Sequence, residues 1–235
     1  MRHVVSRGAG KMKIFLDDGD RRLFMFVLAE VVAEYDLECF DFCLMNNHFH
    51  LSVRNRRRNL SEAMQKLKGE YAACWNVKHR RVGHVFEGPF KDQIVQQDTY
   101  FRNLTRYIAR NPVRAGLVRA PEDWQWSSCR FHAGFAPAPA FLATDHVLRG
   151  FGPVTRPSTR AAYLAHVSAL AVRGDDSELF RSRRRILGDT EFKAALKRRT
   201  VTEQPADVSL SVASSARGQS AGVTRRAQKR GQTRV

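Results

Sequence analysis

Two neighbouring segments of the chain are strand-like runs rich in apolar residues, at 37–45 and 48–54, and only Asn46-Asn47 separates them. Asparagine tolerates the left-handed backbone conformations that a tight turn requires. The pattern therefore predicts a β-hairpin. Shorter apolar runs predict two more strands, over 3–7 and 90–95.

Apolar residues recur at helical spacing in three other segments, 20–36, 60–75 and 98–111. Asn59 with Glu62 three residues later has the form of a capping box, which predicts the start of the second helix. Asp98 is expected to cap the third helix, and Pro112 is expected to end it because proline lacks a backbone N–H. The predicted order is strand, helix, strand, strand, helix, strand, helix.

This order predicts an α+β fold, a ferredoxin-like βαββαβ sheet that carries its two helices on one face. The other face is left free for a ligand or for a further helix. We expect the sheet domain to span residues 1–134 and a small helical extension to span 135–200. Residues 201–235 contain almost no large apolar side chains, so we expect a disordered basic tail there.

Basic residues outnumber acidic ones along the whole chain. There are 40 Lys and Arg against 23 Asp and Glu, which gives a net charge of +17 at pH 7. Such a surface attracts polyanions, so nucleic acid is the leading partner class, with membrane headgroups or solubility alone as alternatives. The helical extension then either contacts DNA or caps the core, and the tail is either a solvated end or a DNA-contacting arm.

Membrane and disulfide signals are both missing from the sequence. The longest apolar stretch, 24–35, is interrupted by Glu30 and Glu34, so we expect neither a signal peptide nor a membrane span. The 4 cysteines form no Cys-x-x-Cys pair, and Cys39 and Cys43 are expected on one strand face as buried small residues. A cytoplasmic, nucleoid-associated protein fits this pattern.

A His-x-His pair gives the first candidate for chemistry. In the strand over 48–54, the alternation places His48 and His50 on the polar side, together with Ser52 and Arg54. Two imidazoles at this spacing can converge on one divalent cation. A chance pairing of histidines is the alternative, because the motif by itself is weak.

Tyr107 is the candidate nucleophile, since a phenol can attack phosphorus when a metal polarises the phosphate. Asn111 lies one helical turn further on and can point the same way. Tyr107 also continues an apolar stripe, so a packed core tyrosine is the alternative. Tyr71 has the same ambiguity and is the rival nucleophile.

Two groups of basic residues surround these candidates and are expected to bind DNA phosphates. One group follows the histidine strand and the other forms a row along the helix of Tyr107: Arg54, Arg56, Arg57, Arg58 and Lys66, and then Arg102, Arg106 and Arg110. A solvated charged face is the alternative for both groups. The candidate stacking surfaces for bases are Trp75, Phe86 and Trp126.

Four ordered motifs extend this pattern: Met45-Asn46-Asn47-His48-Phe49-His50-Leu51, Gly83-His84-Val85-Phe86-Glu87-Gly88 with Phe90-Lys91, the run from Arg106 to Val118, and Trp126-Ser127-Ser128. Together they resemble the successive signatures of the REP-associated tyrosine transposases, which are single-tyrosine, HUH-type transposases of the IS200-like superfamily. The resemblance runs from His3 to about Phe131.

The resemblance implies a metal-dependent transposase that cleaves and rejoins single-stranded or hairpin DNA. His48 and His50 would bind Mg²⁺ or Mn²⁺, and Asn111 would complete the metal site. Tyr107 would attack a DNA phosphate to give a 5′-phosphotyrosine intermediate and a free 3′-hydroxyl. A homodimer that exchanges a helix, so that the tyrosine acts in the partner's site, would have the same sequence features.

Two other functions fit parts of the pattern. One is a protein of the same fold that binds hairpin DNA or structured RNA but has lost catalysis, and the presence of His48, His50 and Tyr107 argues against it. The other is a metal-dependent hydrolase of small phosphoesters, which would need neither the arginine groups nor Tyr107.

Overall fold

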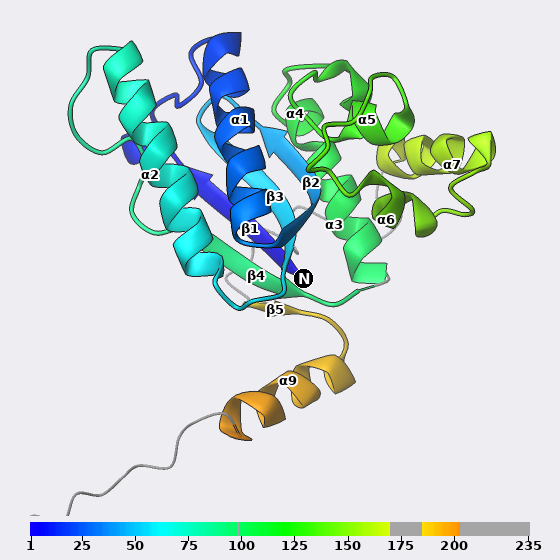
Figure 1. Ribbon diagram of the computed structural model, residues 1–235. Helices are drawn as coiled ribbons and strands as arrows, with labels where there is room; N and C mark the ends of the chain where they lie inside the picture. The colour runs from blue at the N-terminus through cyan, green and yellow to red at the C-terminus, as the bar shows by residue number, and fades with distance from the viewer. Residues whose placement is uncertain (98, 170–184, 203–235) are drawn as a thin grey trace, which may run out of the picture.

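The computed structural model describes residues 1–97, 99–169 and 185–202, and its centre is a single five-stranded sheet (Figure 1). The strands are β1 (Arg2–Arg7), β2 (Leu37–Leu44), β3 (His48–Asn55), β4 (Lys91–Val95) and β5 (Ile186–Leu187). Their order across the sheet is β2-β3-β1-β4-β5. Without β5, this is the ferredoxin-like arrangement that the element order predicts, with β1 antiparallel to both β3 and β4.

Strand β5 was not predicted. The extension over 135–200 was expected to be helical, but Ile186 and Leu187 pair in parallel with Ile94 and Val95 of β4. A free sheet edge offers unpaired N–H and C=O groups, and this short apolar pair satisfies some of them. Two residues are too few to give a sequence pattern, which explains why the strand was missed.

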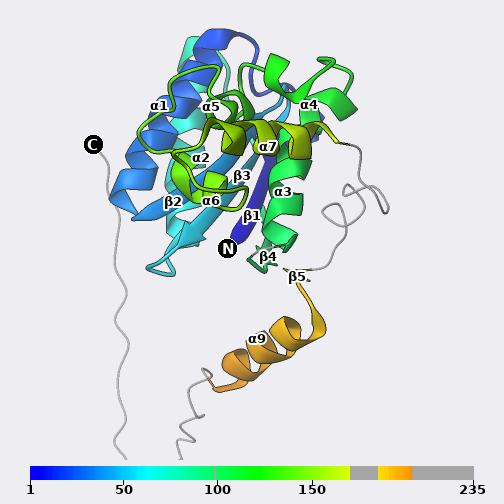
Figure 2. The same ribbon diagram turned by 90° about the vertical axis from the view of Figure 1, so that its right-hand side faces the viewer.

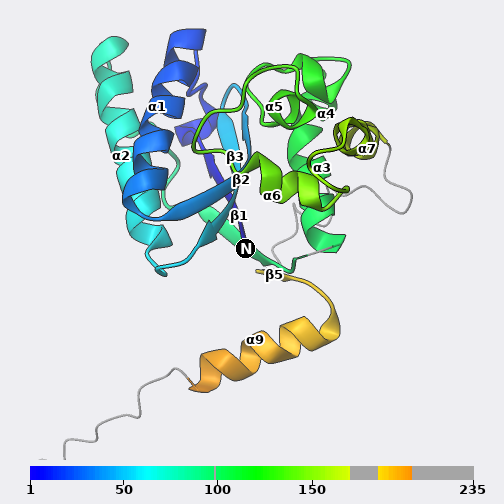
Figure 3. The same ribbon diagram turned by 45° about the vertical axis from the view of Figure 1, so that its right-hand side comes forward.

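Helices cover both faces of the sheet, as Figures 1 and 3 show. On one face lie α1 (Asp18–Glu34) and α2 (Leu60–Lys78), as predicted. The opposite face takes α3 (Thr99–Ala109), α4 (Asn111–Arg114), α5 (Cys129–Ala133), α6 (Thr144–Arg149) and α7 (Pro157–Ser168). The second face is therefore occupied by further helices, and any ligand site on it lies between helix and sheet.

The remaining elements are short or peripheral. Two 3-10 turns, η1 (Ala9–Lys11) and η2 (Pro121–Asp123), lie in connecting segments, and α9 (Thr190–Thr202) projects away from the sheet (Figures 1 and 2). Within the described part of the chain, no helix combines the length and apolar character needed to cross a membrane. The tail predicted to be disordered spans 201–235, and its residues from 203 onward lie outside the described part of the chain. The predicted cap Asp98 also lies outside it.

The largest apolar core lies between the sheet and the α1/α2 pair, where Phe24, Tyr71 and Trp75 are almost completely buried. Burying side chains of this size stabilises the fold by about 1.5–3 kcal/mol each. Trp75 is only 1% exposed, so it is a core residue and not a stacking surface for DNA. Phe86 is 8% exposed and packs in the same cluster.

Two details of the helix ends differ from the sequence prediction. Asn59 makes no side-chain cap to α2 and instead accepts a hydrogen bond from Asn55 Nδ2 at 2.5 Å. Helix α3 ends at Ala109, before Pro112, which lies in the first turn of α4. Proline is tolerated there because N–H groups of a first turn have no partner within the helix.

A β-bulge in β2 separates the two cysteines that were expected on one strand face. The register with β3 shifts between Cys39 and Asp41. As a result Cys39 packs in the core below α1 and α2, whereas Cys43 packs with Leu104 and Tyr107 on the other face. Both cysteines are buried, as predicted, but a bulge adds one residue to the strand and reverses the alternation beyond it.

Candidate functional site

The site begins with a histidine that the sequence did not single out. In the antiparallel pairing of β1 with β3, His3 lies opposite Ser52, and Val5 lies opposite His50. His3 and His50 are therefore diagonal neighbours on one sheet face. Their rings stack with centroids 5.3 Å apart, and His3 Nε2 lies 3.0 Å from His50 Nδ1.

A chain of hydrogen bonds fixes the tautomer of both rings. His3 Nδ1 lies 3.2 Å from the acceptor oxygen Oε1 of Gln93, so His3 donates there and accepts at Nε2. His50 Nδ1–H donates to that nitrogen, which leaves a lone pair on His50 Nε2. This Nε2 atom is buried and has no hydrogen-bond partner within the described residues.

His48 has the same tautomer, with a lone pair available on Nε2. Its Nδ1 donates to Asn47 Oδ1 at 2.7 Å, so its Nε2 also carries a lone pair. The ring centroids of His48 and His50 are 5.0 Å apart. Two neutral imidazoles, each anchored through Nδ1 and open at Nε2, form the usual arrangement of histidine metal ligands.

Burial keeps these imidazoles neutral. It lowers the pKa of His48 to about 4, with Arg7 adding to the shift. Burial also lowers the pKa of His3 to about 4, against the opposing effect of its hydrogen bond to Gln93. The pKa of His50 falls well below its usual value because of burial and of the charges of its neighbours. A neutral imidazole can bind a metal without first losing a proton.

Helix α3 places Tyr107 against this histidine cluster. The tyrosine ring meets the rings of His3 and His50 edge-on, at centroid distances of 5.6 Å in both cases, and the side chain is 4% exposed. The structure thus brings together the His-x-His pair and Tyr107, which are far apart in the sequence.

Arg114 is a further residue of the site that was not predicted. Its guanidinium lies over the Tyr107 ring, 4.2 Å from the centroid, and donates to the Tyr107 carbonyl oxygen at 2.8 Å. Arg114 follows Tyr107 by two helical turns, a spacing that places both on one helix face. That spacing was the available signal, but the helix was expected to stop at Pro112.

Asn111 also lies beside the main chain of Tyr107, since its Nδ2 donates to the Tyr107 carbonyl oxygen at 2.9 Å. Within the described residues, no hydrogen bond joins Asn111 to His48 or His50. The rival nucleophile Tyr71 is in a different place: it is fully buried in the α1/α2 core, where its hydroxyl donates to the Ile14 carbonyl oxygen. Burial raises the pKa of Tyr71, which disfavours the phenolate.

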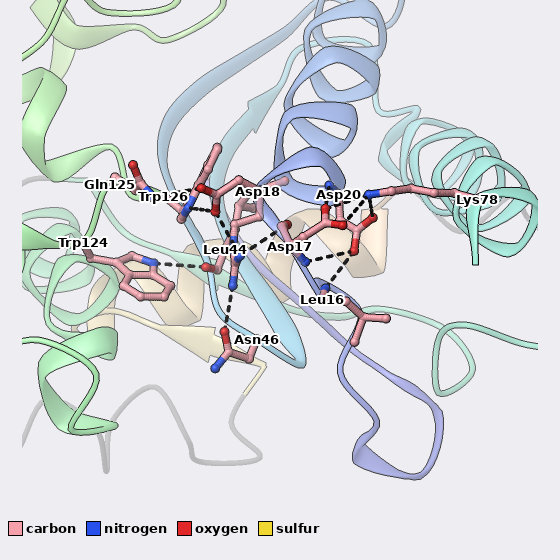
Figure 4. Close-up of polar contacts among 11 residues, drawn as sticks. Leu16, Asp17, Asp18, Asp20, Leu44, Asn46, Lys78, Trp124, Gln125 and Trp126 are labelled. Atoms are coloured by element: carbon pink, nitrogen blue, oxygen red, sulfur yellow. Dashed lines mark hydrogen bonds and ion pairs between the residues drawn. The ribbon is translucent and has the colours of Figure 1, made fainter.

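A second cluster of possible ligands lies at the start of α1, where Asp17, Asp20 and His79 converge. Figure 4 shows the two carboxylates beside Lys78. The Lys78 ammonium already occupies the centre of this cluster, 2.7 Å from Asp17 Oδ1 and 2.6 Å from Asp20 Oδ1. Burial raises the pKa of Asp20, but hydrogen bonds from Lys78 and His79 outweigh it and lower the pKa overall. The cluster is a structural ion pair that joins α1 to α2.

The basic residues beyond the histidine strand face acidic neighbours. Arg54 and Arg56 share Glu38, each with one oxygen at 2.9 Å, and Arg57 lies 3.3 Å from Asp36. Lys66 pairs with Glu34 and Glu70. The segment remains positively charged, because it has four arginines, at 54 and 56–58, and only two carboxylates face them.

The arginine row on α3 is divided among different roles. Arg110 NH1 donates to the Ser168 carbonyl oxygen at 2.7 Å, so it caps the end of α7. Arg106 NH2 donates to Asn103 at 3.3 Å. Arg102 is exposed and lies at a cavity between α3 and α6. Trp126, the remaining candidate for stacking, is half-buried and donates to Asp18 at 3.1 Å (Figure 4).

Comparisons with known proteins address the fold and the sequence family. The structure of a REP-associated tyrosine transposase bound to a REP hairpin is similar, with a TM-score of 0.51 and 14% identity over 60% of this chain and 84% of that chain. A putative transposase from Deinococcus radiodurans R1 has a TM-score of 0.35 and 16% identity over 46% and 86%. No curated protein sequence matches the chain. Residues 1–111 match the sequence model of the family described as "Transposase IS200 like".

Proposed function

We propose that the protein is a metal-dependent transposase that cleaves and rejoins single-stranded DNA through Tyr107. The observation that carries the proposal is the buried Nε2 of His50, which has no hydrogen-bond partner within the described residues and lies beside His48 and the Tyr107 ring. Leaving a buried polar atom without a partner costs about 1–3 kcal/mol, and a bound cation removes that cost. A transposase role is also what the family match supports.

His48 and His50 would hold the metal through their Nε2 atoms, and Mg²⁺ or Mn²⁺ suits a site completed by oxygen ligands. Such an ion, when bound, polarises a phosphate and offsets the charge that develops during phosphoryl transfer. We assign the third protein ligand to Asn111, whose Oδ1 stays open while its Nδ2 is bound to the Tyr107 carbonyl oxygen. His3 and Gln93 hold His50 in the ligating tautomer.

Tyr107 would be the nucleophile. Its phenolic oxygen forms a bond to phosphorus while the bond from phosphorus to the 3′ oxygen breaks. The phenol loses its proton, and the departing 3′ oxygen gains one as a hydroxyl. The product is a 5′-phosphotyrosine, and attack by a 3′-hydroxyl on this linkage rejoins DNA without an external energy source. The Arg114 guanidinium next to the ring favours negative charge on the phenol.

Hairpin DNA is the proposed substrate. The similar solved structure is that of a transposase bound to a REP hairpin, and this chain carries a net charge of +17. Arg54, Arg56, Arg57, Arg58 and Lys66 are proposed to contact the backbone, exchanging their exposed ion pairs for phosphates. Exposed ion pairs of this kind contribute only about 0–1 kcal/mol, so phosphate can displace them.

The experiment uses labelled single-stranded DNA carrying a hairpin from the flanks of the protein's own gene, incubated with Mn²⁺. A covalent protein–DNA adduct is expected on a denaturing gel. EDTA, His50→Ala and Tyr107→Phe should each abolish it. The matched control is Tyr100→Phe, which removes a hydroxyl from the same helix and should leave the adduct intact.

The second candidate function is hairpin binding without catalysis. The proposed contacts of the basic residues with DNA serve binding alone as well as they serve cleavage. DNA binding with no adduct, for several hairpins and both metals, would establish that function instead. A phosphoester hydrolase would retain its activity in the Tyr107→Phe variant, since water replaces the phenol.

A further inference from the structure

A cavity of about 540 Å³ lies between the start of α3 and the end of α6. Its lining residues come from both segments: Gln97, Phe101, Arg102, His146, Arg149 and Gly150. Neither His48, His50 nor Tyr107 lines it. The cavity is thus separate from the metal site, and the helical extension builds one of its walls.

Two unpaired arginines stand at this cavity. Arg102 and Arg149 are both exposed, and within the described part of the chain neither guanidinium makes an ion pair or a hydrogen bond. The arginines near β3 differ, because carboxylates already face them. Two free guanidiniums at one cavity raise the local potential and match the charge and shape of a phosphate group.

The main chain and the aliphatic stem of Arg102 lie against the helical extension. The carbonyl oxygen of Arg102 lies 3.0 Å from His166 Nε2 of α7, which fixes this part of α3 against the extension. A Cβ atom at Gly150 would lie 3.8 Å from Arg102 Cγ, so the turn after α6 lies against the arginine stem. Less conformational freedom is then lost when a ligand binds.

Two of the residues that line the same cavity, Phe101 and His146, carry aromatic rings. The rings of Phe101 and His146 lie 6.0 Å apart, and Phe40 lies beneath both, at 5.6 Å from Phe101 and 4.6 Å from His146. Burial lowers the pKa of His146, and the charges of Arg54 and Arg149 lower it further against an opposing effect of Glu38, which favours the neutral imidazole. Neutral aromatic rings beside cationic groups are typical of proteins that bind single-stranded nucleic acid.

We propose that this cavity binds one nucleotide of single-stranded DNA, with its phosphate between Arg102 and Arg149 and its base against Phe101 and His146. Arg102 precedes Tyr107 by five residues, which is about 7.5 Å along the axis of α3 and about 140° around it, so the two side chains point to different sides of the helix. The bound nucleotide is therefore assigned to the stretch that flanks the cleaved linkage and not to the linkage itself. This assignment rests on the proposed function only in identifying the bound DNA strand as the one that Tyr107 cleaves. It gives the helical extension a direct role in DNA binding.

The test measures DNA affinity in EDTA, where cleavage does not interfere, by fluorescence anisotropy of a labelled hairpin with single-stranded flanks. Arg149→Gln should weaken binding about tenfold, as expected for the loss of one charged hydrogen-bonding group. The salt dependence should change with it, since one lost phosphate contact reduces the slope of log K against log salt by about 0.7 for single strands. Arg22→Gln on α1, an exposed arginine on the opposite sheet face, is the matched control and should change neither quantity.

Neutral methylphosphonate linkages then locate the contact. Placed at successive positions of the flanks, one such linkage should weaken binding to the wild type but not to Arg149→Gln. The inference is overturned if Arg149→Gln and Arg22→Gln bind alike, or if no linkage distinguishes the wild type from the variant. Adduct formation with Mn²⁺ is measured in parallel. If an adduct forms but Arg149→Gln binds DNA like the wild type, the nucleotide site at the cavity is rejected and the proposed function stands. If Arg149→Gln weakens binding but no adduct forms, the nucleotide site stands and the proposed function is rejected.

Discussion

Below α1 and α2 the sheet buries almost only hydrocarbon, whereas below α3 it buries polar side chains. Phe24, Phe49 and Leu51 are typical of the first face, and all three are fully buried. The second face buries residues that each find a hydrogen bond: His3, His50 and Gln93 bond to one another, and Asp41 accepts from Thr105 at 2.9 Å.

Burying a polar group costs free energy unless it is hydrogen-bonded, so the second face contributes less to stability than an apolar face of equal area. His50 Nε2 is among the buried atoms on this side that do not recover this cost within the described residues. The comparison shows that the α1/α2 face contributes most of the stability of the fold, while the α3 face carries the residues of the candidate site. Substitutions on the two faces should therefore affect different measurements.

The largest effect is expected on the apolar face. Phe24→Ala removes a fully buried ring that packs on Phe15, Phe49 and Tyr71, and it should lower the free energy of unfolding by about 3–5 kcal/mol. Urea denaturation measures this change. The matched control is Phe26→Ala on the same helix, where the side chain is 66% exposed and the expected change is within about 0.5 kcal/mol.

The division between the faces also predicts what Phe24→Ala leaves unchanged. The fraction that stays folded should bind Mn²⁺ with the affinity of the wild type, because no contact of Phe24 reaches the histidines. A parallel loss of metal affinity in the folded protein would show that the two faces are not independent.

A smaller but more specific effect is expected on the polar face. His3→Leu removes the acceptor for His50 Nδ1–H and should weaken Mn²⁺ binding about 10–100-fold, as for the loss of other residues that orient metal ligands. Isothermal titration calorimetry measures the affinity. His3→Gln restores an acceptor oxygen at similar reach and should recover most of the affinity, while His84→Ala, which removes an exposed imidazole, should have no effect.

His3→Gln separates positioning from packing. Both His3 variants change the shape of the buried site, so equal losses of affinity would mean that packing, and not the hydrogen bond, decides metal binding. Urea denaturation of both variants identifies any loss that comes from unfolding.

The fold could be predicted from the sequence where one face of an element is buried and the other is not. The helices that begin near Asp18 and Leu60 follow directly from their periodicity. The hairpin over 37–54 has strands that are buried on both faces, and it follows from two apolar runs separated by Asn46-Asn47. The bulge at Cys39 and the two-residue strand β5 could not be predicted, because both depend on contacts with distant segments. Local pattern contains no signal for an extra residue or for a pair of residues at a sheet edge.

The site could be predicted in part for the same reason. His48 and Tyr107 stood out through a motif and a helix face, and the structure brings them together. His3 is an isolated histidine in the first strand, and only the register of β1 against β3 places it on His50. Arg149 likewise needs the packing of the extension before it meets Arg102.

The smallest effect concerns the ion pairs that join α1 to α2. The pKa of Asp20 is lowered in the folded protein, so its contribution to stability is present above the ordinary carboxyl pKa of about 4 and is lost as the pH falls below it. Lys78→Met should lower the free energy of unfolding by about 1 kcal/mol at pH 7 and make it less dependent on pH between about 5 and 3. Urea denaturation across this range provides the test, with Lys11→Met, an exposed lysine outside the cluster, as the control. If the two variants have the same pH dependence as the wild type, the carboxylates at the start of α1 contribute nothing through Lys78, and the stability of this face rests on its apolar core alone.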